Sequence, residues 1–309
     1  MPELPDVDLY AERILGRFRG QKVGAVRLAS PFVLRTVDPP ISTAAGRRLV
    51  GTRRLGKRVV LGLEGDLFLV IHLMVSGRFK LGERGAKVPG KVGLLAIDFD
   101  DGALVLTEAS PKKRASLHVV SGELGLAALD PGGLEPLGLP LRAFSERLLS
   151  ENRTLKRALT DPHLFAGIGN SYSDEILHAA GMSPVSRTQS LDAAAVKRLH
   201  AAVQETLSTW KSRLAAESPV FPEKVTAFRD DFAVHGKFGK PCPRCGTPVQ
   251  RIRYADNESN YCPTCQTGGK LLADRSLSRL LKGDWPKTLE ELEARKSVQS
   301  TSIGRSRSR

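Results

Sequence analysis

The clearest chemistry in this chain belongs to its four cysteines. They form two CxxC pairs, Cys242 with Cys245 and Cys262 with Cys265, and sixteen residues separate the pairs. This spacing is typical of two thiolate pairs that a β-hairpin brings to one tetrahedral zinc ion. Four thiolates leave no open position for water or substrate, so the zinc ion would be structural. Two disulfides or a redox-active CxxC are the alternatives, but a secreted disulfide protein would spread its cystines across the fold.

A second group with chemical potential lies at the N-terminus. Removal of Met1, which is usual before a small residue such as proline, would leave the secondary amine of Pro2 beside the carboxylate of Glu3. Because an α-amine has a pKa of about 8, part of it is neutral at pH 7 and can attack a sugar C1′. A carboxyl group beside it can protonate the ring oxygen as the sugar opens. Without further context, Pro-Glu at a terminus more often simply begins a helix.

The charge balance indicates what these groups act on. Forty-seven Lys and Arg residues against thirty-three Asp and Glu residues give a formal charge of +14. Such a charge favours a polyanionic partner, with nucleic acid ahead of an anionic membrane. No run approaches the roughly 20 apolar residues of a membrane-spanning helix, and no basic and then apolar signal segment begins the chain. We therefore expect a cytoplasmic monomer that binds nucleic acid and no membrane.

The elements that must position these residues follow from the apolar pattern. Helical spacing predicts an amphipathic helix from residue 5 to about 19, and short β-rich runs from about 22 to 120 predict a β-sandwich or barrel. A Gly-, Pro- and Leu-rich stretch from about 122 to 140 has no clear period, and helical patterns resume from 142 to 231. We expect an α+β protein with four parts, which are residues 1–130, 131–236, 237–269 (the zinc ribbon) and 270–309 (a helical extension with a disordered basic tail).

Several sequence blocks together resemble one known family. The opening PELPDVDLY, the segment RRLGKRVVLGL, the run LKRALTDPHLFAGIGNSYSDEILHAAGMSP and the cysteine blocks VHGKFGKPCPRCGTP and YCPTCQ match, in order, the formamidopyrimidine-DNA glycosylase and endonuclease VIII family. The resemblance covers about residues 2 to 269. It implies an N-terminal catalytic β-sandwich with a flanking helix, a helical helix–two-turn–helix domain and a zinc ribbon. The implied function is a bifunctional DNA glycosylase and AP lyase that repairs damaged double-stranded DNA in a bacterial nucleoid.

The resemblance also implies a role for individual residues. Pro2 would be the Schiff-base nucleophile, Glu3 its acid and base partner, and Lys57 a second amine near the damaged site. Lys156 and Asn170 would contact the DNA backbone. Lys57 could instead be one of several solvated cations. The GIGN turn that ends in Asn170 could cap a helix, a geometry that also points N–H groups at an anion.

Other basic residues are candidates for DNA binding. The loop EASPKKRASL stands where a related branch, specific for oxidised guanine, carries an arginine and an aromatic wedge, and here it offers only cations. Between the two cysteine pairs, further cations belong to a hairpin that could meet phosphates or simply be solvated. These candidates are Lys112, Lys113, Arg114, Arg251 and Arg253. Met74 could fill the gap left by an extruded base or belong to the core.

Two further departures bear on activity. Asp6 replaces the family's usual glutamate with the same charge and one fewer methylene. Asn257 stands where the ribbon usually carries an arginine that engages the lesion phosphate, and Lys237 or the hairpin arginines are possible substitutes. The loss of that cation supports an alternative function, a catalytically silent sensor of damaged DNA. A third interpretation, an RNA- or ribosome-associated zinc-ribbon protein, fits the charge and the RSRSR ending but not the N-terminal block.

Overall fold

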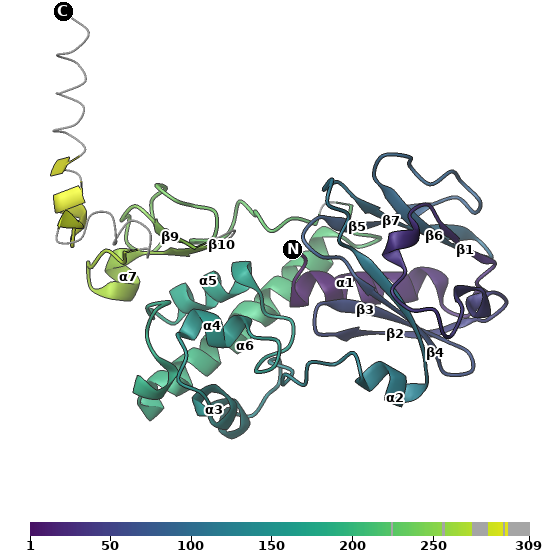
Figure 1. Cartoon of the computed structure of the whole chain (residues 1–309). Coiled ribbons are helices and arrows are strands. Elements are labelled where there is room, and N and C mark those ends of the chain that lie inside the picture. Colours follow the sequence, from purple (N-terminus) through teal and green to yellow (C-terminus); the bar gives the residue numbers. More distant parts are fainter. Residues whose placement is uncertain (224, 255–256, 274–283, 293, 296–309) are drawn as a thin grey trace, which may run out of the picture. The chain divides into compact units, whose positions relative to one another are not determined.

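The computed structural model describes residues 1–223, 225–254, 257–273, 284–292 and 294–295. The chain forms two compact units, which we describe separately (Figure 1). The first unit comprises residues 1–147, 159–169 and 204–227, and the second comprises residues 148–158, 170–203 and 228–309. Among the described residues, no helix has the length and apolar character needed to cross a membrane.

The first unit begins with the predicted amphipathic helix, α1 (Leu4–Phe18), whose buried face includes Tyr10, Ile14 and Phe18. Eight strands follow and form two four-stranded antiparallel sheets. One sheet has the order β1 (Ala25–Leu28), β6 (Gly93–Phe99), β7 (Gly102–Glu108) and β5 (Gly77–Gly82). The other has the order β2 (Leu49–Leu55), β3 (Arg58–Leu63), β4 (Leu67–His72) and β8 (Ser116–Ser121). Two short 3-10 turns, Pro31–Val33 and Ile41–Ala44, lie between β1 and β2.

Alternation along the strands explains why two layers form. In β3 and β4, Val59, Leu61, Leu69 and Ile71 point into one large apolar core that they share with α1 and the other sheet. Their neighbours Val60, Val70 and Phe68 belong to a separate cluster with Leu126 on the opposite face. Because successive side chains of a strand point to opposite faces, each sheet can bury both sides. The predicted β-sandwich is therefore confirmed.

The observed helices differ from the sequence pattern at two places. The stretch from about 122 to 140, in which the sequence shows no clear period, contains a short helix, α2 (Gly122–Ala127), which packs on β4 and β8. Its six residues are too few for a helical period to be visible. The helical pattern expected to reach residue 231 ends with α6 (Ala193–Glu217), which is followed by Ser218, Pro219 and Pro222. Proline lacks the N–H that a helix interior requires.

The remaining helices are α3 (Leu141–Leu149), α4 (Leu155–Thr160) and α5 (Asn170–Ala179), with a 3-10 turn at Thr188–Ser190. The predicted ribbon is a hairpin of β9 (Gln250–Tyr254) and β10 (Asn257–Tyr261), followed by α7 (Pro263–Thr267). Within the second unit, α5 contacts β10 and α7. The basic tail and most of the expected C-terminal helix lie outside the described residues.

Candidate active site and nucleic-acid-binding residues

Glu3 is held in place at the start of α1. Its side chain is 2% exposed, and its Oε2 accepts a 2.8 Å hydrogen bond from the backbone N–H of Gly169. The N–H of Glu3 donates to Oδ2 of Asp6 at 3.0 Å, and the N–H of Leu4 donates to the carbonyl of Gly167 at 3.0 Å. The side chain of Asp6, one methylene shorter than the family's usual glutamate, therefore still accepts the N–H of Glu3. Pro2, which precedes Glu3 in the chain, is buried.

The side-chain amine of Lys57 also lies beside Gly169. A Cβ built on Gly169 would be 2.6 Å from Oε1 of Glu3 and 2.8 Å from Nζ of Lys57. The carboxylate and the ammonium group, which lie 54 positions apart in the sequence, thus converge on one glycine. The structure brings together two of the three residues predicted to be catalytic, next to the third.

This convergence gives a prediction for Gly169→Ala. The added methyl group must displace the Glu3 carboxylate or the Lys57 amine, and a displacement of about 1 Å can cost on the order of 100-fold in rate. We expect strand cleavage at an abasic site to fall by about that factor. The melting temperature should change little, because both displaced groups are ends of flexible side chains. Gly16→Ala on the same unit is the control, since a Cβ there meets nothing within 4 Å. Equal activity of both variants would contradict the prediction.

The electrostatic environment favours a neutral amine at the N-terminus. Burial lowers the pKa of the terminal amine, here on Met1, below 8. Glu3 and Asp6 oppose this shift, whereas Arg78 and Lys57 add to it. Arg78, in the segment IHLMVSGRF (residues 71–79), was not recognised from the sequence as a residue of this site. Its guanidinium is fixed by the carbonyls of Gly77 at 2.6 Å and Val225, so its charge stays near the amine.

Met74 occupies a tight turn between β4 and β5. It is half-buried, has a positive φ of 52°, and donates its N–H to Nδ1 of His72 at 2.9 Å. Gly77 closes the turn with a 2.8 Å hydrogen bond to the carbonyl of Leu73. A Cβ on Gly77 would lie 2.2 Å from that same oxygen, so only glycine fits. Met74 is not among the buried core residues, which leaves a void-filling role open as a prediction.

The basic loop after β7 presents only part of its charge to solvent. Lys112 and Arg114 are exposed. Lys113 has a φ of 42°, and its Nζ donates to the carbonyls of Lys91 at 2.9 Å and Glu108 at 2.5 Å. Lys113 thus stabilises the loop from within, and Lys112 and Arg114 are the better placed of the three to meet phosphates.

In the second unit, Lys156 is part of an internal ion pair. It is 5% exposed, and its Nζ donates to Oδ1 of Asp174 and to the carbonyl of Asn170, both at 2.6 Å. Asn170 is the first residue of α5 and is half-buried. A direct phosphate contact by Lys156 would require this pair to open, so its predicted role is better described as positioning the start of α5.

Asp174 is the centre of a buried polar network that the sequence did not reveal. Besides Lys156, its carboxylate bonds Nδ1 of His235 at 2.8 Å, Oγ of Ser259 at 3.1 Å and the N–H of Asn260 at 3.1 Å. Burial alone would raise the pKa of Asp174, but Lys156 and His235 outweigh it and the pKa is lowered. The network therefore ties α5 to the ribbon strand β10 through one charged carboxylate.

Replacing this carboxylate tests the network. Because Asp174→Asn removes the carboxylate that faces the buried Lys156 ammonium at 2.6 Å, the free energy of unfolding should fall by about 3 kcal/mol or more. Urea denaturation followed by circular dichroism measures the change. Asp192→Asn, which removes an exposed carboxylate at the start of α6, is the matched control and should cost about 1 kcal/mol or less. A similar loss of unfolding free energy in both variants would argue against a charged Asp174 at the centre of the buried network.

The adjacent Glu175 holds the segment that leads into the ribbon. Its carboxylate accepts backbone N–H groups from Ala233 at 2.7 Å, Val234 at 3.0 Å and His235 at 2.9 Å. Burial raises its pKa even though these three donors oppose the shift. Two neighbouring carboxylates of α5 therefore hold both ends of the segment that runs from residue 233 to β10. Glu175 binds the start of this segment, and Asp174 binds β10.

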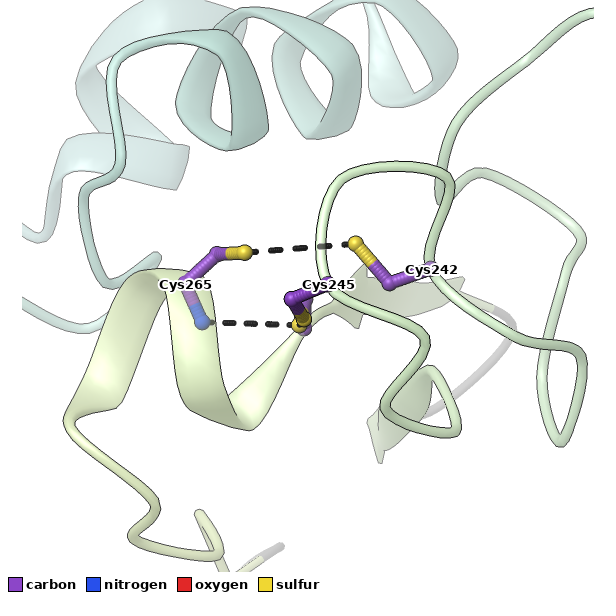
Figure 2. A group of neighbouring side chains, drawn as sticks. Cys242, Cys245 and Cys265 are labelled. Atoms are coloured by element: carbon purple, nitrogen blue, oxygen red, sulfur yellow. Dashed lines mark hydrogen bonds between the residues drawn. The ribbon is translucent and has the colours of Figure 1, made fainter.

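The four cysteine sulfurs lie within 4.8 Å of one another, as a shared metal requires. Figure 2 labels three of these residues, Cys242, Cys245 and Cys265. The Sγ atoms of Cys242 and Cys265 are 3.9 Å apart, and those of Cys245 and Cys262 are 3.4 Å apart. Tetrahedral Zn–S bonds of about 2.3 Å place sulfurs about 3.8 Å apart. Burial raises the pKa of the Cys262 thiol, so a cation is needed to keep it as a thiolate. The site fits one structural zinc ion.

The hairpin above this site carries the other predicted cations. Arg251 lies over the ring of Phe238 at 4.3 Å from its centre, and its Nη1 is 3.5 Å from Oε2 of Glu258. The side chain of Arg253 is 63% exposed, and its Nε lies 4.0 Å from Oε2 of Glu258, which is a longer contact than that of Arg251. Arg253 is therefore the freer of the two for phosphate contact. Asn257 pairs with Tyr254 through the backbone, and its side chain lies outside the described residues.

Three family models match the chain in the order seen in the structure. The formamidopyrimidine-DNA glycosylase N-terminal domain matches residues 1–115, the H2TH domain of that enzyme matches residues 133–211, and the zinc finger found in FPG and IleRS matches residues 239–268. A β-sandwich, a helix–two-turn–helix domain and a zinc ribbon together define a class of DNA-repair glycosylases. The chain belongs to the formamidopyrimidine-DNA glycosylase family.

Individual relatives agree with this assignment. The formamidopyrimidine-DNA glycosylase of Chloroflexus aurantiacus is 33% identical over 275 residues, which is 86% of this chain and 98% of the relative. That of an Acidovorax species is 31% identical over 274 residues, with 86% and 99% covered. Among solved structures, the complex of Lactococcus lactis Fpg with DNA containing an abasic site has a TM-score of 0.77 at 27% identity, with 86% and 99% covered. MutM bound to DNA with carbocyclic 8-oxo-G has a TM-score of 0.76 at 26% identity.

Proposed function

We propose that this DNA glycosylase is bifunctional: it excises a damaged base from double-stranded DNA and then cleaves the strand as an AP lyase, using the amine of Pro2. The convergence of the Glu3 carboxylate and the Lys57 amine on Gly169, beside a terminal amine whose pKa is lowered, carries this proposal. The similar structure of the Lactococcus lactis protein, which is bound to DNA containing an abasic site, supports the substrate class.

Each step has a group on the first unit that can perform it. The neutral Pro2 nitrogen attacks C1′, the bond from C1′ to the base breaks, and the base leaves with its electron pair and takes up a proton. Glu3 protonates the ring oxygen as the sugar opens, giving an iminium ion between Pro2 and C1′. The iminium acidifies C2′–H. The Glu3 carboxylate, which has just given its proton to the ring oxygen, takes up the C2′ proton, and the 3′ phosphate leaves with the electron pair of the C3′–O bond by β-elimination. Lys57, next to Glu3, stabilises the negative charge that develops nearby.

The preferred lesion is set by segments in which this chain departs from its relatives. The loop with Lys112 and Arg114 has no aromatic residue to replace an extruded base, which disfavours a specialist for 8-oxoguanine. Asn257 offers no cation to the phosphate that a second elimination would release. We therefore expect β-elimination to be more efficient than the subsequent loss of the 5′ phosphate.

Borohydride trapping on a duplex with one abasic site tests the proposal. Borohydride reduces the iminium to a stable covalent adduct, which mass spectrometry can locate on Pro2. A form with glycine inserted before Pro2, which displaces the amine by one residue, should form much less adduct. Tight, salt-sensitive binding without any adduct would overturn the lyase proposal in favour of a catalytically silent damage sensor, which the absent ribbon arginine suggests.

The terminal amine on Met1 has a lowered pKa because it is buried, and we expect the adjacent Pro2 amine, once Met1 is removed, to be shifted in the same direction. Only the neutral amine attacks, so the trapping rate should rise with pH and reach half its plateau below pH 8. Arg78→Gln removes a cation that lowers this pKa and should move the midpoint upward. Single-turnover trapping from pH 5 to 9 with both proteins measures this. A midpoint that stays the same in the variant would contradict the role given to Arg78.

A further inference from the structure

Helix α5 turns one polar face toward the ribbon. Asp174 accepts the N–H of Asn260 in β10, and Glu175 accepts the N–H of Ala233. His178 comes four positions after Asp174, so the two side chains lie on the same face of the helix, one turn apart. His178 is 5% exposed, although no step of the proposed reaction uses it. A buried imidazole needs a hydrogen-bond partner, and that partner indicates its role.

The partner of His178 is a cysteine sulfur. Its Nε2 lies 3.2 Å from Sγ of Cys242, a residue that is itself 2% exposed. The loop around this sulfur is tight, because the N–H of Cys242 donates to the carbonyl of Thr247 at 2.9 Å and its carbonyl accepts the N–H of Gly246 at 2.8 Å. The contact therefore joins an imidazole on a helix to a sulfur that its own loop holds in place.

The end of α5 is tied to both cysteine loops. Nη2 of Arg244, in the first CxxC loop, donates to the carbonyl of Ala179 at 3.3 Å. Nε2 of Gln266, directly after the second CxxC loop, donates to the carbonyl of Met182 at 2.8 Å. Because both bonds fall within four residues of His178, they keep its ring against the cysteine site.

The direction of the bond between His178 and Cys242 follows from the chemistry of the site. Cysteine binds zinc as a thiolate, which has no proton to donate. In the metal-bound protein, Nε2 must therefore carry the proton and donate it to the sulfur. A hydrogen bond to an ionised acceptor is stronger than one between neutral groups, and it favours the charged form of the acceptor. This bond and metal binding therefore stabilise each other.

The two buried sulfurs of the site each have an N–H donor. Sγ of Cys262 accepts the backbone N–H of Cys265 at 3.4 Å, and Sγ of Cys242 has the side chain of His178. Four thiolates carry twice the charge of one zinc ion, so the loaded site is net negative. Buried charge is costly unless it is hydrogen-bonded. The two donors offset this cost at the two sulfurs that solvent reaches least.

We propose that His178 belongs to the zinc site as a hydrogen-bond donor: its Nε2–H donates to the zinc-bound sulfur of Cys242 and slows the loss of the metal, without binding the ion itself. The proposal goes beyond the lyase reaction, because it concerns how the ribbon retains its zinc. It also gives α5 a second function. The helix that begins at Asn170, a predicted DNA contact, carries near its end a side chain that stabilises the metal.

The affinity of the full-length protein for zinc tests this role. His178→Phe keeps an aromatic ring but removes the N–H, so the dissociation constant, measured by competition with a chelator, should rise about 10–100-fold. His178→Gln retains an N–H and should restore most of the affinity. Thr264→Ala is the matched control, because it removes a 2.8 Å hydrogen bond to Thr247, between the two cysteine loops, without involving a sulfur. Equal zinc affinity of His178→Phe and the wild type would overturn the proposal.

Cobalt substitution separates a bond to sulfur from a packing effect. The thiolate-to-Co²⁺ charge-transfer bands in the near ultraviolet report the electron density on the sulfurs. Loss of the N–H donor raises that density, so the bands of His178→Phe should move to longer wavelength, and those of His178→Gln and Thr264→Ala should not move. Weaker metal binding with unchanged bands would make His178 a packing residue. A wild-type spectrum with the intensity of three thiolates would make it a ligand, and either result would overturn the proposal.

Nitrogen-15 NMR of the unaltered protein gives a test that no folding defect of a variant can obscure. In the zinc-loaded protein, the His178 ring should carry a proton on Nε2. A ring protonated on Nδ1 alone would leave the Cys242 sulfur without this donor and would contradict the proposal. None of these measurements uses DNA, so a failure of the lyase proposal and a failure of this one can be told apart.

Discussion

Glu3→Gln is expected to lower the rate of base excision and strand cleavage by about 10²–10⁴-fold, the usual contribution of a positioned acid or base. Glutamine keeps a carbonyl oxygen that can accept the N–H of Gly169, so the local fold should survive. What it loses is the proton that Glu3 delivers to the ring oxygen. Single-turnover kinetics on a duplex with one abasic site measure the effect.

Glu12→Gln is the matched control for that variant. Glu12 lies on the same helix, is about half exposed, and pairs with Lys211 at 3.1 Å. Its replacement should leave the rate within about twofold, since an exposed ion pair contributes little to stability and nothing here to chemistry. If Glu3→Gln retained the wild-type rate while folding normally, Glu3 would be a structural residue of the helix start and another group would have to supply the proton.

The sequence was sufficient for elements with a strong local signal. Apolar spacing predicted α1, and β-rich runs predicted β3, β4, β6, β7 and β8. The CxxC pairs predicted a metal site whose sulfurs the structure brings together. Each of these signals is contained in a window of a few residues or in a fixed spacing, which is why one sequence is enough to read it.

The buried network around Asp174 could not be predicted from the sequence. Its partners Lys156, His235 and Asn260 come from positions far apart in the chain and from different elements. Nothing in a local pattern distinguishes them from solvated polar residues. For the same reason Lys156 was predicted as a phosphate contact, whereas the folded chain places its ammonium in an internal ion pair. Only tertiary structure decides which charges are exposed.

Gly169 illustrates the same limit at the candidate active site. Its place in GIGN indicated only a turn that opens a helix, which is a property of the backbone alone. The structure gives it a different importance, because its missing side chain makes room for Glu3 and Lys57. The roles of Pro2, Glu3 and Lys57 remain predictions from the family resemblance, and the geometry supports them without testing the chemistry.

Removal of zinc is expected to abolish tight duplex binding, with an affinity loss of at least about 100-fold. Metal binding supplies most of the folding free energy of small zinc domains, about 10–16 kcal/mol in isolated peptides. Without it, the hairpin that carries Arg251 and Arg253 would lose its shape. The ribbon also contributes Ser259 and Asn260 to Asp174, so part of the second unit should loosen with it.

Chelation and a matched pair of variants measure this effect. Zinc content should be one ion per chain, falling in Cys262→Ser, whose sulfur is buried at the centre of the site. Thr264→Ala, between Cys262 and Cys265, is the control, because its hydroxyl bonds Thr247 at 2.8 Å and is no metal ligand. Fluorescence anisotropy should show weak binding for the chelated protein and Cys262→Ser, and normal binding for Thr264→Ala. Unchanged affinity and salt slope after complete zinc loss would mean that the ribbon contributes no DNA contact, and that the first unit and α5 suffice to bind the duplex.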